Sequence, residues 1–362
     1  MDISFSVFFK SIPLIKPYNL SFGPIKTFDT FYVIAKSLES KNEIGIGEIT
    51  PLPGYNHETV ASVTKSLNTM VRRIQGGEPV SVVLSSLMEK APFAVSGVTV
   101  ATELLCRYSE MTGKSLSKSI PLAALCDAPT PVMMGRRAVE LCSQGFSTLK
   151  LKVGQHNITD ELARVRSVAS SVSSGVFVRL DANQCYNFNQ ALQLCKGLEG
   201  VDNVSFLEQP FKFDQWNATE KLIKETTLPI MLDESIWTEL DVDRATNIGA
   251  RFVKFKLCKH CGIEGSLDLI RKAKSNKMGI IYGNGVQTAL GNHYEAIIHE
   301  QADIQTATEG NGFLKVQDPV FRGAMSMEKG CLSDQGLDYA IFNRNHWKCV
   351  IQEVVFSLDE VI

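Results

Sequence analysis

This 362-residue sequence lacks most of the features that mark specialised classes of protein. It has no apolar run that approaches the length of a membrane span, so we predict no membrane partner. It has no basic arm or acidic tail, because 37 Lys and Arg face 39 Asp and Glu and the formal net charge is −2. This balance argues against nucleic acid as a partner.

The N-terminus also lacks the basic segment, clean apolar core and small-residue cleavage site of a secretory signal. Nine cysteines are scattered along the chain, an odd number that fits reduced thiols better than a disulfide framework. Together these features predict a cytoplasmic protein. The hydrophobic content of 44% is ordinary for a globular protein, and the length suits a barrel plus a second domain.

Residues 1–125 have a mixed texture that predicts an N-terminal α+β domain. Alternation of apolar and polar residues is typical of antiparallel strands, and wider apolar spacing is typical of amphipathic helices. The predicted strands span 30–40 and 43–49, and the predicted helices span 58–77 and 97–116. Gly76 and Gly77 mark the end of the first helix.

After residue 125, short apolar runs alternate with amphipathic helical stretches. Successive runs start 18 to 28 residues apart, about the length of a strand, a helix and two loops. The eight runs span 130–134, 148–153, 176–181, 204–208, 229–233, 252–257, 279–283 and 303–307. They predict a TIM-type barrel of parallel strands, which we assign to residues 126–330. Residues 331–362 are aromatic and β-rich, and we predict that they return to the N-terminal domain.

Three successive runs end in a carboxylate: Asp181, Glu208 and Asp233. The active site of such a barrel lies at the carboxyl ends of its strands, and neighbouring strands are about 4.8 Å apart. The three groups can therefore converge on one ion. Oxygen ligands without Cys or His suit a hard cation, and we predict Mg²⁺. A single Asp at a strand end is common in caps and turns, but three in register favour a metal site.

Two of the runs carry alternating lysines, which is unusual for a buried strand. They are Lys150 and Lys152 in the second run and Lys254 and Lys256 in the sixth, and Lys259 follows in the loop. Because side chains alternate between the faces of a strand, each pair points toward the barrel interior. An unpaired buried lysine is costly, but carboxylates and a metal supply partners.

Two interpretations of these lysines are open. They either neutralise the acidic cluster, or they act as general bases whose pKa is lowered by burial and by a nearby cation. We favour the second interpretation for Lys152 and Lys256, and both stay open for Lys150, Lys254 and Lys259.

A divalent cation with bases on opposite walls predicts a type of reaction. The carboxylate of a small-molecule substrate chelates Mg²⁺, which acidifies the adjacent carbon–hydrogen bond, and a lysine removes this proton. The metal stabilises the resulting enediolate. The opposite lysine returns a proton to the other face or assists the departure of a leaving group.

Several motifs resemble those of the enolase superfamily, in its muconate-lactonizing-enzyme subgroup. They are KLK at 150–152, LDAN at 180–183, LEQP at 207–210, LDES at 232–235 and KLCKHCGI at 256–263. The superfamily uses Lys or His bases together with Mg²⁺ ions. The resemblance covers essentially the whole chain and implies an α/β fold, in which a modified (β/α)7β barrel carries an α+β capping domain.

The resemblance also implies roles for individual residues. The implied Mg²⁺ ligands are Asp181, Glu208 and Asp233. Lys152 and Lys256 are the implied acid/base residues, with Lys150 supporting Lys152 electrostatically. The candidate substrate-binding residues are Tyr55, Lys254, Asn284, Glu309 and Asn311. A homo-oligomer is implied as well.

Two departures from the family pattern bear on the substrate. Many relatives have a Glu after the seventh run, where this chain has Gln287. Dipeptide-epimerase relatives carry an Asp-x-Asp after the eighth run, which would hold a substrate ammonium, and the residues here are Glu309, Gly310 and Asn311. This chain is therefore less suited to an ammonium-bearing substrate than the dipeptide-epimerase relatives are. His293 is expected to be a surface or capping histidine.

We therefore predict an enzyme that abstracts a proton α to a carboxylate and racemises or epimerises an N-acyl amino acid or a dipeptide. Two facing lysines suit such a 1,1-proton transfer. Syn-dehydration, as in o-succinylbenzoate synthesis, and cycloisomerisation stay open, because each needs one base and a cationic helper. A non-catalytic acid-binding protein is an alternative of another class, and three carboxylates with both lysines argue against it.

Overall fold

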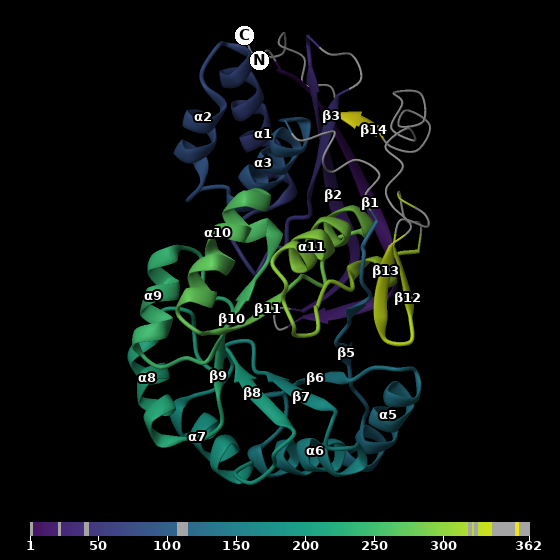
Figure 1. The fold of residues 1–362 in the computed structure, drawn as a ribbon, viewed down its shortest axis with the longest axis vertical. Coiled ribbons are helices and arrows are strands. Elements are labelled where there is room, and N and C mark those ends of the chain that lie inside the picture. Colours follow the sequence, from purple (N-terminus) through teal and green to yellow (C-terminus); the bar gives the residue numbers. More distant parts are fainter. Residues whose placement is uncertain are drawn as a thin grey trace.

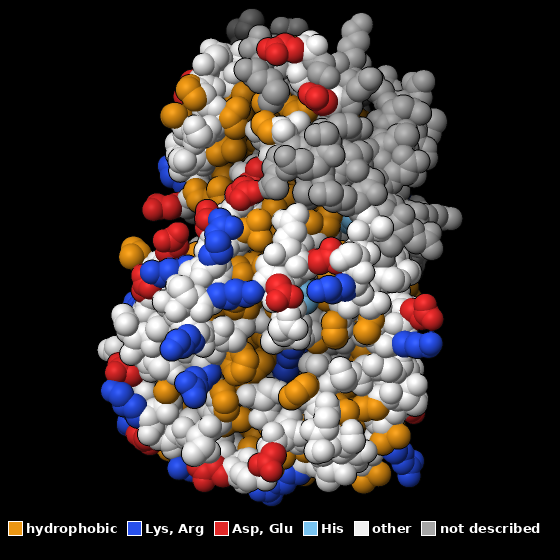
Figure 2. Space-filling view, viewed as in Figure 1, with side chains coloured by type: hydrophobic (Ala, Val, Ile, Leu, Met, Phe, Trp, Pro, Cys, Tyr) orange, Lys and Arg blue, Asp and Glu red, His pale blue; other side chains and the backbone are white. Residues whose placement is uncertain are grey.

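The computed structural model describes residues 3–20, 23–39, 43–106, 115–317, 321, 325–334 and 352–354. Figure 1 shows two parts, with an antiparallel sheet and helices α1 to α3 at the top and a curled parallel sheet with its helices below. Figure 2 shows basic and acidic side chains intermixed over the lower part of this face. No helix of the described residues is long and apolar enough to cross a membrane.

The upper part is built on a four-stranded sheet in the order β14-β1-β2-β3. The strands are β1 (Ile3–Leu20), β2 (Gly23–Ser37), β3 (Ile44–Ile49) and β14 (Gln352–Val354), and the helices are α1 (Val60–Gln75), α2 (Val80–Leu87) and α3 (Pro92–Cys106). The strand predicted at 43–49 is confirmed as β3, and the strand predicted at 30–40 is part of β2, which starts earlier and ends at Ser37. The first predicted helix is α1, which ends at Gly76 as expected.

Helix α3 packs closely on strand β3, and two glycines of this strand permit the contact. A Cβ on Gly47 would lie 1.8 Å from the Gly97 carbonyl oxygen, which no side chain can tolerate. The helix predicted at 97–116 begins earlier, at Pro92, and part of its predicted range lies outside the described residues.

The lower part contains a parallel sheet in the order β11-β10-β9-β8-β7-β6-β5. Its strands are β5 (Ala124–Leu125), β6 (Thr148–Lys152), β7 (Phe177–Asp181), β8 (Val204–Glu208), β9 (Ile230–Leu232), β10 (Phe252–Phe255) and β11 (Gly279–Tyr282). The helices are α5 (Pro131–Ser143), α6 (Ile158–Ser171), α7 (Phe188–Gly197), α8 (Trp216–Glu225), α9 (Glu239–Asn247), α10 (Gly262–Ser275) and α11 (Ala289–Gln301). The predicted α/β fold with a modified TIM barrel is confirmed.

The strand predicted at 130–134 is wrong, because this run forms the first turns of α5. The Thr130 side chain accepts a hydrogen bond from the Met133 amide, and Pro131 occupies the first helical turn. Both features favour a helix start over a strand. The first strand of the sheet is β5, which pairs in parallel with β6.

The strand predicted at 303–307 is also wrong, because the structure assigns no strand to these residues. The residues that follow nevertheless close the curled sheet. The Thr308 amide donates to the Pro121 carbonyl at 2.8 Å, and the Glu309 amide donates to the Tyr282 carbonyl at 3.1 Å. The segment therefore spans from β11 to the chain that precedes β5 without forming a ladder.

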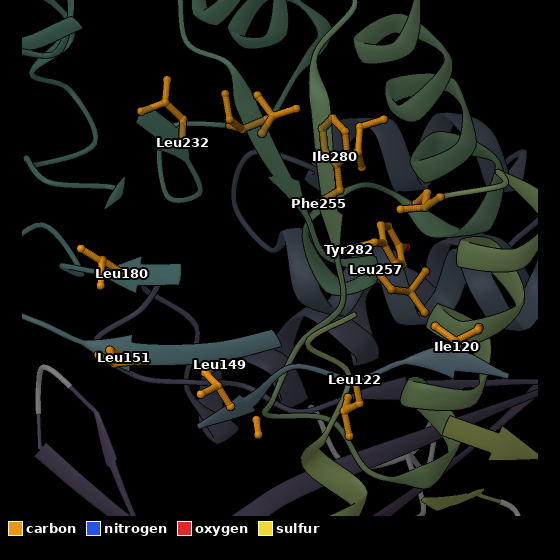
Figure 3. Packing of buried hydrophobic residues seen from close by; sticks show 14 of the residues in the cluster. Ile120, Leu122, Leu149, Leu151, Leu180, Leu232, Phe255, Leu257, Ile280 and Tyr282 are labelled. Carbon is orange, nitrogen blue, oxygen red and sulfur yellow. The ribbon is translucent and has the colours of Figure 1, made fainter. Parts of the chain in front are cut away.

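The two faces of the sheet are packed differently. Outward residues such as Leu149, Leu180 and Leu232, labelled in Figure 3, belong to a large buried cluster. This cluster also contains side chains of the surrounding helices. Each such side chain contributes roughly 1.5–3 kcal/mol through burial. The inward face has only a small apolar floor, centred on Phe206 and Met231. Above this floor the interior is ionic.

The remaining elements connect the two parts. The hairpin of β12 (Met325–Glu328) and β13 (Cys331–Asp334) pairs with β4 (Ile120–Pro121), which precedes the parallel sheet. Strand β14 pairs with β1, although most of the predicted C-terminal segment lies outside the described residues. Two 3-10 turns, η1 (Leu257–Lys259) and η2 (Gly312–Leu314), lie at the cavity end of the barrel. The domain boundaries at 125 and 330 stay predictions.

Candidate active site

A cavity of about 100 Å³ opens where the parallel strands end. It is lined by ten of the residues singled out from the sequence: Tyr55, Lys150, Lys152, Asp181, Asp233, Lys254, Lys256, Asn284, Glu309 and Asn311. Glu208 lies just beneath and is fully buried. The N-terminal part supplies Tyr18, Leu52 and Tyr55 to the lining. The structure thus brings the predicted residues together at one place.

The three carboxylates occupy the predicted strand ends. Asp181 ends β7 and is in register with Glu208, which ends β8, and Asp233 directly follows β9. All three are at most 2% exposed. Side chains alternate along a strand, and the residue that precedes each carboxylate belongs to the outer core. All three carboxylates therefore point inward.

Two lysines bridge these carboxylates at the deeper level of the cavity. Lys150 Nζ lies 2.7 Å from Glu208, 2.8 Å from Asp181 and 2.6 Å from Glu309. Lys254 Nζ lies 3.1 Å from Glu208 and 2.5 Å from the same Glu309 oxygen. Each ammonium therefore contacts more than one carboxylate, and Glu309 joins the two lysines.

Arg179 adds a third cation to this layer and was missed from the sequence. Its guanidinium donates to the Ala307 carbonyl at 3.0 Å and lies 3.5 Å from the second oxygen of Glu309. It also lies over the Phe206 ring at 5.7 Å. A signal existed, since Arg179 precedes Asp181 by two residues in one strand and must share its inward face.

At the rim, Lys152 faces Asp181. Its Nζ lies 2.7 Å from the carboxylate and 2.5 Å from Asn183 Oδ1. Burial is the largest single effect and disfavours the ammonium, but Asp181 together with Tyr18 and Glu208 outweighs it, so the pKa of Lys152 is raised above its ordinary value. Burial acts in the expected direction, but the ion pair with Asp181 helps to reverse the net shift in this arrangement.

Lys256 occupies the other side of the rim. Its Nζ lies 2.7 Å from Asp233 and 2.9 Å from the hydroxyl of Tyr55, and it sits 4.3 Å above the centroid of this ring. Tyr55 in turn donates to Asp233 at 3.1 Å. The tyrosine comes from the loop after β3, so the N-terminal part touches the rim directly.

The structure also places Lys259, Gln287 and His293. Lys259 is fully buried and donates to the Asp233 carbonyl at 2.7 Å, and burial lowers the pKa of Lys259 to about 8. This position fits the neutralising interpretation. Gln287 and His293 are buried and do not line the cavity. The expectation of a surface or capping His293 is wrong, because the residue lies inside α11 beside Tyr294.

The protonation of the carboxylates in this layer depends on burial and on their charged neighbours. Burial and the Asp181 carboxylate raise the pKa of Glu208 to about 7, although Lys150 and Lys254 oppose this effect. Burial also disfavours an ionised Asp181, but Lys150 and Lys152 outweigh it and hold its pKa below the ordinary value. The interior thus holds carboxylates that need cations to stay ionised.

The donor set fits a hard divalent cation by its chemistry. In the part of the chain that the structure describes, no three His, Cys, Asp or Glu side chains are close enough together to hold a metal as they stand. Lysines bridge the carboxylates instead, through Lys150 and Lys254. Glu234 has a buried oxygen without a hydrogen-bond partner among the described residues, which a cation or its water would satisfy.

A curled parallel sheet with an acidic cluster and lysines at its carboxyl end has the arrangement of a barrel enzyme, whose active site lies at that end. The family described as Enolase C-terminal domain-like matches residues 133–337. This match covers more than half of the chain, so the protein belongs to this family, within the enolase superfamily.

Similar proteins extend this finding over most of the chain. L-Ala-D/L-Glu epimerase from Bacillus subtilis is 24% identical over 343 residues, covering 90% of this chain and 92% of the relative. o-Succinylbenzoate synthase from Thermosynechococcus vestitus is 26% identical over 296 residues, covering 79% and 85%. The crystal structure of the Cytophaga hutchinsonii dipeptide epimerase complexed with Mg and D-Ala-L-Val has a TM-score of 0.83 at 20% identity, covering 98% and 99%.

These relatives and others carry the names of epimerases, racemases and synthases. They are isomerases or lyases of the enolase superfamily, and this chain is an enzyme of that class. The predicted membership of the superfamily is confirmed.

Proposed function

We propose that this enzyme removes the proton α to a carboxylate in an Mg²⁺-dependent reaction and racemises or epimerises an N-acyl amino acid or a dipeptide. One observation carries the proposal. The strands of Asp181, Glu208 and Asp233 lie side by side in the sheet, and the strands of Lys152 and Lys256 flank them on either side. A substrate held over the carboxylates therefore has a lysine on each face.

Three carboxylates would hold the cation: Asp181, Glu208 and Asp233. Bound there, Mg²⁺ supplies positive charge that stabilises the negative charge developing on the substrate carboxylate. The carboxylates reach this arrangement by exchanging their contacts with Lys150 and Lys254. The shared pairing with Glu309 keeps both lysines in place when that exchange occurs.

The rim lysines handle the proton. In one direction Lys152 Nζ takes the α-proton and Lys256 Nζ delivers a proton to the opposite face, and the roles reverse for the other enantiomer. The base must be neutral, and its pairing with Asp181 favours the charged form. A Lys152 released from Asp181 has a lower pKa, because burial alone disfavours its charge.

The experiment is proton NMR in D₂O with Mg²⁺ and a library of N-acyl amino acids and dipeptides. Deuterium appearing at the α-carbon, with formation of the other stereoisomer, supports the proposal. Loss of the α-proton with a new alkene signal would make dehydration the reaction instead. Absence of exchange across the library, with Mg²⁺ binding shown by calorimetry, would contradict it. The Lys196→Ala variant serves as a surface control, since Lys196 is exposed and pairs with Glu199.

A further inference from the structure

One corner of the cavity contains a cation without an acidic partner. Lys315 lines the cavity, and its Nζ donates to the Gly285 carbonyl at 2.7 Å and to Asn311 Oδ1 at 2.8 Å. It lies 3.9 Å above the centroid of the Tyr18 ring. All these partners are uncharged, and within the described ranges no carboxylate oxygen is recorded within 4.0 Å of this ammonium.

The other lysines of the cavity differ from Lys315 in this respect. Each of the four on β6 and at the end of β10 contacts at least one carboxylate. Their carboxylate neighbours are therefore already engaged. A half-buried ammonium that is held only by neutral oxygens retains most of its capacity to bind an anion.

The corner is shaped as a cradle around a glycine. A Cβ built on Gly285 would lie 2.6 Å from Lys315 Nζ, 2.9 Å from Asn311 Oδ1 and 3.5 Å from the Tyr18 hydroxyl. Three polar groups from two segments, β1 and the chain around η2, thus converge beside a residue without a side chain. Any other residue at position 285 would fill the space that they face.

The total charge of the lining favours an anion as well. Five lysines and three carboxylates line the cavity: Lys150, Lys152, Lys254, Lys256 and Lys315 against Asp181, Asp233 and Glu309. Glu309 is also not free to hold a substrate ammonium, because its Oε2 already accepts hydrogen bonds from Lys150 and Lys254.

We propose that Lys315, Tyr18 and Asn311 form a subsite for a second carboxylate of the substrate, so that the substrate is a dicarboxylate such as an amino acid N-acylated by a dicarboxylic acid. This inference rests on the proposed function for the α-carboxylate and the α-proton, and adds the substrate class. Lys315 and the Tyr18 hydroxyl donate to the second carboxylate, and the Asn311 side chain holds the ammonium in position.

The electrostatics of the corner agree with this role. Burial lowers the pKa of Lys315, and the charge of Lys152 lowers it further, although Tyr18 and the charge of Glu309 oppose both effects. Lys315 in turn lowers the pKa of Tyr18 to about 8, which makes its hydroxyl a better hydrogen-bond donor. An anion in the cradle would relieve the desolvation of the ammonium.

The test compares three ligands that differ only in the acyl group: N-succinyl-, N-acetyl- and L-alanyl-L-alanine. Calorimetric affinity and α-proton exchange in D₂O are measured for each with the Mg²⁺-loaded protein. The expected result is that the N-succinyl compound binds at least about tenfold more tightly than the other two, as for hydrogen bonds between charged groups. In Lys315→Met this preference falls to about twofold or less.

Two further variants make the test specific. Gly285→Ala fills the cradle and is expected to reduce the same preference. Lys274→Met is the matched control, because exposed Lys274 also donates to two main-chain carbonyls, of Ala302 and Asp303, and the preference should persist.

Equal affinity for the three ligands, or a preference that survives both Lys315→Met and Gly285→Ala, would overturn the subsite. Exchange at the α-carbon without any N-succinyl preference would leave the proposed function intact and refute only the subsite. A Lys315-dependent N-succinyl preference in binding without exchange would support the subsite and refute the proposed reaction.

Discussion

Strand β6 carries one deep and one rim lysine, and the chain of β10 does the same, but the two levels of the cavity are built differently. The deep lysines, Lys150 and Lys254, share two carboxylates, Glu208 and Glu309. Each rim lysine pairs with a single carboxylate at 2.7 Å and contacts one neutral group, which is Asn183 for Lys152 and Tyr55 for Lys256.

This difference indicates what each level can do. A deep lysine that loses one carboxylate keeps another, so its position and charge are determined by several partners. A rim lysine that loses its carboxylate keeps only a neutral partner. The deep level is suited to holding the site together, and the rim is suited to moving a proton. The predictions below break or sharpen this contrast.

Replacement of either rim lysine should have the largest effect on activity. Lys152→Ala and Lys256→Ala are each expected to lower the rate of racemisation by about 10²–10⁴-fold, the contribution of a general acid or base. Their free energy of unfolding should change far less than their activity. Polarimetry and urea unfolding measure the two quantities, and a variant that keeps full activity would remove its lysine from the mechanism.

Replacement of Glu309 should have the largest effect on stability. Glu309→Ala leaves Lys150, Lys254 and Arg179 without their common partner, and removing one member of a buried ionic network costs about 3–5 kcal/mol. Urea unfolding measures the loss. Glu220→Ala is the control, since Glu220 pairs with Lys224 on the surface. Equal stability of both variants would show that the deep level does not hold the site together.

Removal of the Tyr55 hydroxyl should affect one side of the rim. Tyr55→Phe loses hydrogen bonds to Asp233 and Lys256 but keeps the ring beneath the ammonium. A loss of about 0.5–1.5 kcal/mol per bond predicts a rate lower by roughly tenfold. The effect should be larger for the proton transfer assigned to Lys256 than for that of Lys152. An equal effect on both proton transfers would show that Tyr55 does not act specifically through Lys256.

Glu295 gives the smallest prediction, which concerns pH. Its carboxyl accepts from the amides of Leu257, next to Lys256, and of Asn284. Burial raises the pKa of Glu295 from 4.5 to about 8, so the folded protein binds this proton where the unfolded chain does not. The resulting stabilisation is complete below pH 4.5 and is lost as the pH rises toward 8.

The comparison of wild type with Glu295→Gln isolates this effect. The amide stays neutral at every pH, so the free energy of unfolding of the wild type should fall relative to the variant between pH 5 and pH 8. Urea unfolding at both pH values measures the difference. Parallel pH dependence in the two proteins would contradict a raised pKa.

Much of the site was predictable because strands impose alternation. Once β6 and β7 were recognised, the inward direction of Lys150, Lys152 and Asp181 followed from the two-residue period. The same rule could have identified Arg179. Apolar runs alone do not distinguish strands from helices, and the run at 130–134 is helical because Thr130 caps α5.

Other features depend on contacts that no local pattern contains. Lys315 follows a short 3-10 turn, and only tertiary structure brings it beside Gly285 and Tyr18. The pKa of Lys152 likewise depends on its distance from Asp181, which decides whether burial or pairing prevails. Sequence spacing predicted which groups meet, but not which of two opposing electrostatic effects is larger.

The most direct test of the central claim is α-proton exchange in D₂O with each separate enantiomer of a turned-over substrate. The two-sided rim predicts that Lys152→Ala abolishes exchange from one enantiomer and retains it from the other, and that Lys256→Ala shows the opposite selectivity. If both variants lost exchange from the same enantiomer, or if neither lost any, the assignment of one base to each face would be contradicted.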